Sequence, residues 1–186
     1  MRQSKFFMPT LKEAPSDAVA KSHQLMLRGG YIRQVTAGVY AYLPLGYRVL
    51  RKAENIIEEE MDNINVPEMI MPHLLPATLW QESGRYKKYG AEMFKLQDRH
   101  GRESLLGPTH EETFTEIVAK NLKSYKQMPL ALYQIQTKFR DENRPRFGLL
   151  RGREFVMLDG YSFAATREQL DEQFDDQKSA YLKIFN

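Results

Sequence analysis

The sequence predicts an α+β fold in which helices flank an antiparallel sheet. Helical and strand-like patterns are intermixed along its 186 residues, a length that suits one domain with its own core. Two strand-like stretches, around 131–142 and 151–163, are joined by a loop without a crossover helix, so we expect them to pair antiparallel. The composition, 42% hydrophobic and 27% charged, is typical of an ordinary soluble globular protein.

The residue types exclude several classes of protein. The chain has no cysteine, which excludes disulfides and thiolate metal sites and fits a reducing cytoplasm. No apolar run approaches the length of a membrane span, and Pro9 and Pro15 interrupt the beginning before the apolar core of a secretory signal can form. The net charge of +3 permits a polyanionic partner without requiring one, so the distribution of charge matters more than its total.

The first third of the chain contains two expected helices with a strand between them. Ser16 or Asp17 can cap the first helix, which would end at Gly29-Gly30. Its residues at helical spacing are Val19, His23 and Met26. A short strand near 39–43 follows, and apolar positions at intervals of three and four predict a long amphipathic helix over 46–64.

The middle of the chain combines short strands with helical turns. Residues 67–72 have the pattern of a strand bounded by prolines, and a helical turn is expected around 77–82. The stretches 92–97 and 103–106 flank Asp-Arg-His-Gly, which is typical of a hairpin turn.

Two further helices are expected to begin at capping boxes. Thr109 with Glu112, and Thr166 with Gln169, have the required spacing. The residues expected on the apolar side of the last helix are Leu170, Phe174, Tyr181 and Phe185. This helical pattern reaches the last residue without a glycine or proline stop signal, so we expect the natural protein to continue.

Five arginines lie between positions 140 and 153: Arg140, Arg144, Arg146, Arg151 and Arg153. Because successive side chains of a strand point to opposite faces, Lys138, Arg140 and Glu142 are expected to share a polar face. On the returning strand, Arg151, Arg153 and Phe155 share a face. Paired as a hairpin, the two strands would present guanidinium groups, carboxylates and one aromatic ring together.

Two interpretations fit this polar face. The ordinary one is a solvated sheet face whose charges only keep the edge soluble. However, guanidinium is suited to bidentate contacts with phosphate or carboxylate, and Phe155 has no core role on a solvated face, whereas a flat purine would stack on it. The pattern therefore favours a phosphate or nucleotide site in which Glu142 accepts from an exocyclic amine.

The same residues resemble a known family. KFRDE at 138–142 and RGREF at 151–155 resemble motif 2 of the class II aminoacyl-tRNA synthetases, at about 137–160, and the stretch at about 46–72 resembles motif 1. The whole chain is similar to the bacterial-type prolyl-tRNA synthetases, through the motifs GPTHEE (107–112), LWQESGRY (79–86) and DGYSF (159–163). The resemblance implies that residues 1–186 are the N-terminal portion of a class II catalytic core.

The resemblance also implies roles in binding ATP. Arg140 would bind the α-phosphate and the substrate carboxylate, and Glu142 would accept from the adenine amino group. Arg151 would hold the γ-phosphate, and Phe155 would stack on adenine. ATP is then a substrate, and Mg²⁺ a cofactor whose ligands cannot be identified in this chain.

Further roles concern proline and tRNA. Thr109 and Glu111 would contact the secondary amine of proline, although an acidic residue is favoured in the first turn of a helix whatever its function. Arg144 and Arg146 would lie in the loop that approaches the tRNA acceptor end, with plain solvent exposure as the alternative. His110 is given no role, and the four histidines lack the spacing of metal ligands, so no protein metal site is expected.

The implied function is the ATP-dependent activation of proline to prolyl-adenylate and its transfer to the 3′ end of tRNA(Pro). The enzyme would be a cytoplasmic homodimer joined through the motif 1 region, with no membrane association. Motif 3, the editing insertion and the anticodon-binding domain have no counterpart in residues 1–186, so the chain is expected to be incomplete alone. Leu158 and Ala164 also depart from the lysine and histidine expected in many relatives.

Three other functions remain open from the sequence. A noncatalytic synthetase-like fragment or module could bind RNA or a protein partner, although the intact motif 2 residues argue against it. A sister class II enzyme for threonine, serine or glycine is disfavoured by GPTHEE and by the missing metal ligands. A plain basic RNA-binding domain is the weakest, because the charge is nearly balanced and the arginines are confined to one hairpin.

Overall fold

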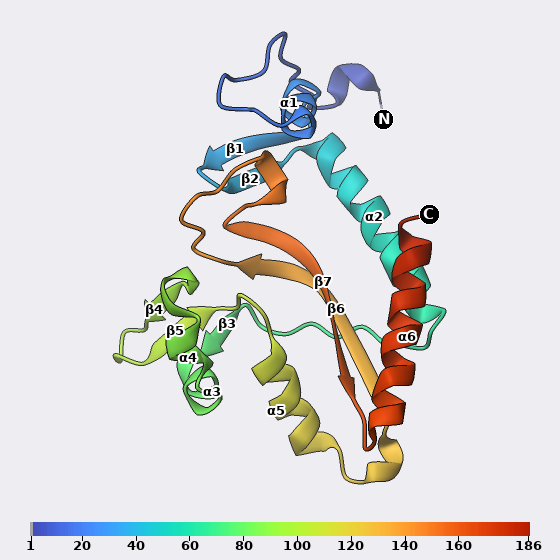
Figure 1. The fold of residues 1–186 in the computed structure, drawn as a ribbon. Helices are drawn as coiled ribbons and strands as arrows, with labels where there is room; N and C mark the ends of the chain where they lie inside the picture. The colour runs from blue at the N-terminus through green and yellow to red at the C-terminus, as the bar shows by residue number, and fades with distance from the viewer. Residues whose placement is uncertain (1) are drawn as a thin grey trace.

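A long antiparallel hairpin runs through the middle of the molecule (Figure 1), formed by β6 (Leu130–Phe139) and β7 (Glu154–Phe163). The computed structural model describes residues 2–186. Helices α2 (Pro44–Asp62) and α6 (Arg167–Ile184) lie along one side of the hairpin, and α5 (Glu111–Asn121) lies on the other. The expected α+β class, an antiparallel sheet flanked by helices, is confirmed.

Two smaller antiparallel sheets accompany the hairpin. One pairs β1 (Ile32–Thr36) with β2 (Val39–Tyr42), and the other has the order β3-β5-β4, with β3 at Leu74–Pro76, β4 at Lys95–Gln97 and β5 at Glu103–Leu106. The remaining α-helices are α1 (Lys21–Arg28), α3 (Ala77–Glu82) and α4 (Arg85–Lys88). Short 3₁₀ turns are η1 (Gln3–Lys5), η2 (Gly90–Glu92), η3 (Tyr125–Gln127) and η4 (Gly148–Leu150).

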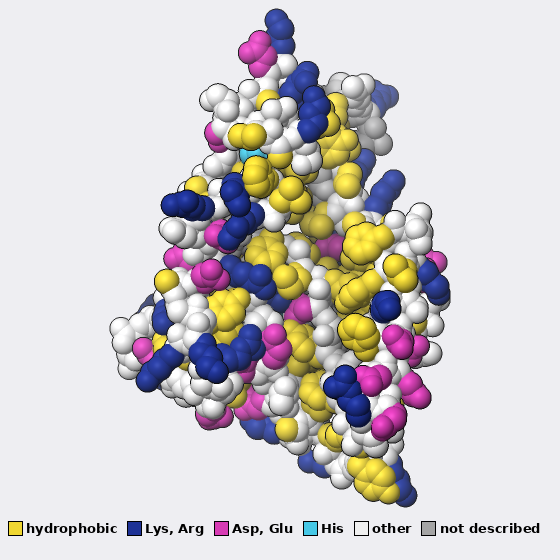
Figure 2. Space-filling model, viewed as in Figure 1, with side chains coloured by type: hydrophobic (Ala, Val, Ile, Leu, Met, Phe, Trp, Pro, Cys, Tyr) yellow, Lys and Arg dark blue, Asp and Glu magenta, His cyan; other side chains and the backbone are white. Residues whose placement is uncertain are grey.

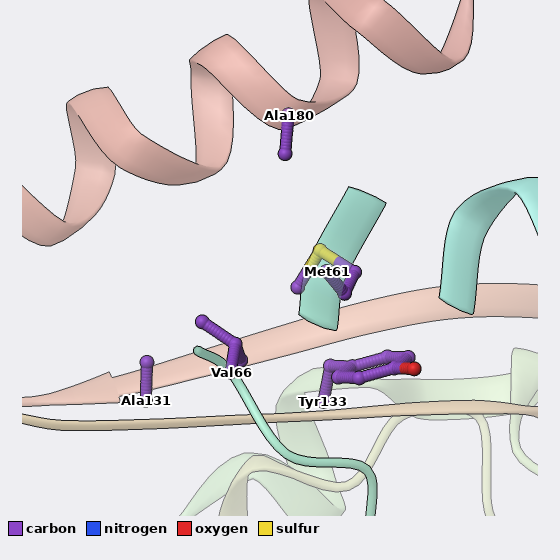
Figure 3. Packing of buried hydrophobic residues seen from close by; sticks show 5 residues of the cluster. All are labelled: Met61, Val66, Ala131, Tyr133 and Ala180. Atoms are coloured by element: carbon purple, nitrogen blue, oxygen red, sulfur yellow. The ribbon is translucent and has the colours of Figure 1, made fainter. Parts of the chain in front are cut away.

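The predicted long helix forms as α2, two residues earlier than expected at each end. Pro44 is its first residue, where a missing N–H costs nothing. Its last turn packs into a core between the hairpin and α6 (Figure 3). That cluster consists of Met61, Val66, Ala131, Tyr133 and Ala180. Burial of these side chains fixes both long helices against one face of the hairpin.

The opposite face of the hairpin carries α5. Phe114 and Val118 of this helix pack with Leu132 of β6 and with Met71. Alternation along β6 explains the division, because Tyr133 and Leu132 point to opposite faces. The hairpin is therefore covered on both sides along β6, most of whose residues are buried, whereas the residues of β7 stay partly exposed.

Residues 67–72 are extended but do not form the expected strand. They run beside β6 in parallel, where the Met69 N–H donates to the Tyr133 carbonyl at 2.7 Å and the Tyr133 N–H donates to the Pro67 carbonyl at 3.2 Å. Prolines at both ends lack the N–H groups that would continue the ladder. The regular strand begins later, at β3.

The caps of two helices differ from expectation. Helix α1 begins at Lys21 after Ala20 without a side-chain cap, so the prediction of a cap at Ser16 or Asp17 is wrong, although the helix does end at Gly29-Gly30. Helix α5 has His110 at its N-cap position and no side-chain cap. The capping box of Thr109 and Glu112 is also wrong, because both side chains have other partners, as described below.

The final helix matches its predicted start better than its predicted face. The Thr166 hydroxyl accepts from the Gln169 N–H at 3.3 Å, which confirms the N-cap. Phe174 and Phe185, expected on the buried side, are 66% and 87% exposed. Only the part of α6 around Ala180 meets the core among the described residues.

The hairpin expected around residues 98–101 is confirmed as β4 and β5. Its turn is closed by the Asp98 carboxylate, which accepts hydrogen bonds from the N–H groups of His100 and Arg102 at 2.8 and 3.0 Å.

The N-terminal hairpin was predicted only in part: β2 was expected, whereas β1 was not. Strand β1 has three exposed residues and no clear hydrophobic alternation that would mark it.

Candidate active site

The polar face of β6 is buried rather than solvated. Gln134 and Lys138 are 0% exposed, and Gln136 is 6% exposed. The extended segment 67–72 covers part of this face, since Gln134 Oε1 accepts from the Met71 N–H at 3.1 Å. Polar groups are costly to bury without partners, and this face has a hydrogen-bond network. The interpretation as a solvated face is therefore wrong for β6, whereas Arg151 is 49% exposed at the side chain.

Asp159 of β7 is the acidic centre of this network. Its Oδ1 lies 2.8 Å from the Nζ of Lys138, and its Oδ2 accepts from Gln134 Nε2 at 3.0 Å. Burial lowers the pKa of Lys138, and the neighbouring Asp159 carboxylate opposes that shift. The floor of the site therefore contains a buried ion pair that crosses the hairpin.

His110 is part of the network, although sequence reasoning assigned it no role. The ring is 0% exposed, with Nδ1 lying 3.0 Å from Gln134 Nε2 and Nε2 lying 3.1 Å from the Pro72 carbonyl oxygen. Because an amide nitrogen only donates and a carbonyl only accepts, Nδ1 is the acceptor and Nε2 carries the proton. Burial and the charge of Lys138 lower the pKa of His110, so the ring is neutral.

Tyr161 connects the network to the turn that precedes α5. Its hydroxyl accepts from the His110 N–H at 3.1 Å, donates to Asp159, and lies 3.5 Å from Thr109 Oγ1. Burial, followed by the Asp159 carboxylate, raises the pKa of Tyr161, so it stays protonated. Sequence reasoning missed this residue as well, although strand alternation places it on the same face as Phe155.

The buried Thr109 and the half-exposed Glu111 lie next to each other, near Tyr161. The Thr109 hydroxyl donates to Glu111 Oε2 at 2.5 Å, and the same oxygen lies 3.2 Å from Arg85 Nη1. Burial disfavours ionisation of Glu111, but the hydrogen bonds from Thr109 and Arg85 outweigh it and lower the pKa of this carboxyl. Glu111 is thus a half-exposed carboxylate at neutral pH.

Arg140 links this turn to Phe155. Its Nε and Nη2 donate to the Pro108 carbonyl at 3.3 Å, next to Thr109. Its Cζ lies 5.3 Å from the centroid of the Phe155 ring. Arg140 follows the last residue of β6, so it projects from the end of the strand rather than from its face.

Glu142 and Arg151 form an ion pair of their own. Arg151 Nε lies 2.9 Å from Glu142 Oε2, and this contact lowers the pKa of Glu142. Strand β7 begins at Glu154, so Arg151 belongs to the preceding loop and not to the strand face as expected. The Glu142 N–H donates to the Arg140 carbonyl at 2.7 Å, which keeps the pair next to the Arg140 and Phe155 contact.

The loop arginines contact this pair through their backbone: the Arg144 N–H donates to Glu142 Oε1 at 3.4 Å, and the Arg146 N–H donates to the Arg151 carbonyl at 3.1 Å. Arg144 and Arg146 are exposed, and Arg146 Cζ lies 5.1 Å from the ring centroid of Phe147. Arg153, which was expected to share a strand face with Arg151 and Phe155, lies just before β7 and pairs with Asp141 at 2.5 Å. Figure 2 shows basic side chains beside a hollow in the middle of this face of the molecule.

The donor set does not suggest a metal centre of the protein's own. Within residues 2–186, no three His, Cys, Asp or Glu side chains are grouped so that they could hold a metal ion. No magnesium ligand is therefore assigned. Separately, none of the helices in the described part of the chain is both long and apolar enough to cross a membrane.

Comparison with known proteins finds a matching family and similar curated proteins. The family described as "tRNA synthetase class II core domain (G, H, P, S and T)" matches residues 94–186, from β4 to the end of α6. Among curated proteins, the chain is 94% identical to the "Proline--tRNA ligase" of Lactobacillus acidophilus and 83% identical to that of Lactobacillus delbrueckii subsp. bulgaricus, over 185 residues in each case. These matches cover 100% of this chain and 33% of each relative, so the chain spans about a third of their length.

A solved structure confirms the fold. The Giardia lamblia prolyl-tRNA synthetase in complex with prolyl-adenylate superposes with a TM-score of 0.78 over 84% of this chain and 33% of that one, at 24% identity. The resemblance read from motifs 1 and 2 and from GPTHEE is thus confirmed at the level of sequence and of fold. The family match covers half of the chain, which therefore belongs to the family of class II tRNA synthetase core domains.

Proposed function

We propose that the full-length protein containing this chain is a proline–tRNA ligase. It activates proline with ATP to give prolyl-adenylate and pyrophosphate, and then transfers the prolyl group to the 3′ end of tRNA(Pro). The observation that carries this proposal is the 94% identity, over the whole chain, to a curated protein named proline–tRNA ligase. The arrangement of the candidate site is consistent with each step.

Proline recognition is assigned to Thr109 and Glu111. A secondary ammonium group taken out of water needs a carboxylate or comparable acceptors, and Glu111 is held ionised beside the Thr109 hydroxyl. Arg140 approaches the same turn through the Pro108 carbonyl and would pair with the substrate carboxylate. The ammonium group of proline would thus pair with Glu111, and its carboxylate would pair with Arg140.

ATP recognition is assigned to the other half of the site. The Phe155 ring would stack on adenine, and Glu142 would accept from the adenine amino group. Arg140 would neutralise charge on the α-phosphate as the proline carboxylate attacks it, and Arg151 would hold the γ-phosphate. Mg²⁺ would enter with the nucleotide phosphates, and no step is derived through it because no protein ligand is assigned.

The remaining features concern the whole enzyme. Arg144 and Arg146 are exposed in the loop before β7, where they would contact the tRNA acceptor end. The motif 1 region, about 46–72, would join two copies in a cytoplasmic homodimer. Motif 3, an editing insertion and an anticodon-binding domain would lie in the two thirds of the relatives' length that this chain does not cover.

Replacement of Arg140 tests the proposal. Arg140→Ala in the full-length enzyme removes a preorganised donor to the transition state, so proline-dependent ATP–pyrophosphate exchange should fall about 10²- to 10³-fold. Arg102→Ala is the matched control, since Arg102 is 76% exposed at the side chain and pairs with Asp98 across its own turn. Exchange that is equal in the two variants would refute the assignment of Arg140.

A further inference from the structure

Arg85 is held in place from three sides. Its guanidinium carbon lies 4.9 Å from the ring centroid of Trp80, which is 0% exposed. Its Nη1 lies 3.1 Å from Glu112 Oε1, and the Glu112 side chain is only 6% exposed. Ser83 Oγ donates to the same carboxylate oxygen at 2.9 Å, which fixes that carboxylate in turn. The long arginine side chain is therefore anchored before any substrate is considered.

The anchored guanidinium reaches Glu111. Arg85 Nη1 lies 3.2 Å from Glu111 Oε2, the oxygen that also accepts from Thr109. Both contacts thus fall on one oxygen of the carboxylate. This geometry orients the group, and the contacts with Arg85 and Thr109 do not use its second oxygen, Oε1.

We propose that Arg85 is a positioning residue for amino-acid recognition: anchored on Trp80 and Glu112, it fixes Oε2 of Glu111 and leaves Oε1 to accept from the substrate's secondary ammonium. This inference rests on the proposed function. It assigns a role to the stretch Leu79–Tyr86, which the sequence comparison picked out but the ATP and proline assignments did not use. It also explains why Glu112 does not cap α5.

The charges around Glu111 come from several elements. Arg85 of α4 and Thr109 touch it, and Glu112 is its neighbour on α5. Tyr89, after α4, and the buried Lys138 of β6 lie close enough to interact electrostatically with it. Arg85 is the cation in direct contact, so its removal should raise the pKa of Glu111 more than the loss of a distant charge would.

The test compares steady-state exchange kinetics of full-length enzymes. In Arg85→Ala the KM for proline should rise about tenfold, while kcat and the KM for ATP change less than about twofold, because only the orientation of Glu111 is lost. Arg85→Lys should restore part of the loss, since an ammonium keeps the charge without the planar fork. Arg102→Ala, an exposed arginine on the β4–β5 hairpin, should leave all three constants unchanged.

The pH profile separates positioning from a general structural defect. Without Arg85, Glu111 takes up a proton at a higher pH, so the acid limb of kcat/KM for proline should move to higher pH in Arg85→Ala. A uniform fall of kcat/KM with an unmoved limb, or an unchanged KM for proline, would overturn the inference. If Arg85→Ala does not fold, Glu112→Gln serves instead, and a KM for proline equal to that of the wild type would have the same consequence.

The same experiment distinguishes this inference from the proposed function. Wild-type enzyme without proline-dependent exchange would overturn both. Wild-type exchange with proline, combined with normal proline kinetics in the Arg85 variants, would overturn only the role of Arg85.

Discussion

Asp159 is the centre of the buried polar network beneath the candidate site. Its carboxylate forms an ion pair with Lys138 and accepts hydrogen bonds from Gln134 and from the Tyr161 hydroxyl. Through Tyr161 it supports the turn that holds Thr109. A buried carboxylate is tolerated only when its partners compensate for lost hydration. Removal of this charge would leave the Lys138 ammonium group buried without a counterion.

Asp159→Asn should therefore lower the free energy of unfolding by about 3–5 kcal/mol, the range for breaking a buried ion pair. Urea denaturation of the wild-type and variant enzymes at pH 7 would measure the change.

A matched control for this substitution lies on α6. Asp171 pairs with Arg167 at 3.0 Å, and both side chains are more than half exposed. Because exposed pairs contribute little, Asp171→Asn should change the free energy of unfolding by less than about 0.5 kcal/mol. Equal effects of the two substitutions would mean that the Lys138–Asp159 pair is not stabilising as described.

At the scale of single residues, the motifs indicated residues that the structure brings into contact, whereas residues revealed only by tertiary contacts were missed; the roles assigned to the motif residues stay predictions. The contacts of Arg140 with Phe155, and of Thr109 with Glu111, agree with the sites expected from sequence. The contact between His110 and Tyr161 joins residues 51 positions apart. No local spacing could indicate that hydrogen bond.

At the scale of elements, the amphipathic and hairpin patterns predicted most of the secondary structure, while caps and short strands depended on neighbours. The predicted capping box at the start of α5 does not form, because the Thr109 hydroxyl donates to Glu111 and Glu112 forms an ion pair with Arg85. The strand predicted at 67–72 does not form, because its prolines lack the N–H groups that would continue the hydrogen-bond ladder with β6. Local propensity is a weak prior that tertiary contacts override.

The N-cap of α6 gives a direct test at this scale. Thr166→Ala removes the acceptor for the Gln169 N–H and should lower the free energy of unfolding by about 1 kcal/mol. Thr166→Ser keeps the hydroxyl and should differ little from the wild type in the same denaturation experiment. A serine variant as unstable as the alanine variant would show that the methyl group, and not the cap, matters.

For the molecule as a whole, α2 leaves apolar side chains uncovered among the described residues. Tyr47, Val49 and Ile56 are 55%, 51% and 50% exposed, although they lie on the longest helix. Ile56 also lines an apolar groove of about 430 Å³ between α2 and α6. Exposed apolar surface of this kind is typical of interaction sites, which supports the proposed homodimer through motif 1.

A charge on α2 should weaken that dimer. Val49→Asp in the full-length enzyme should raise the dimer dissociation constant at least about 30-fold, measured by analytical ultracentrifugation, because a buried unpaired charge is costly at an interface. Leu96→Asp is the control: Leu96 is 44% exposed but lies in β4, on the other side of the long hairpin from α2 (Figure 1). Dissociation that is unchanged by Val49→Asp would exclude this surface from the dimer interface.

The hydrogen bonds that hold the turn before α5 have a consequence for synthesis on the ribosome. Thr109 and His110 are made early, but the hydroxyl that steadies them belongs to Tyr161 in the second strand of the long hairpin. A nascent chain therefore cannot complete this turn, which carries the proposed proline-binding residues, until that strand has left the exit tunnel and paired with β6. Until then, Thr109 and His110 lack the hydroxyl group that holds their turn in the folded protein.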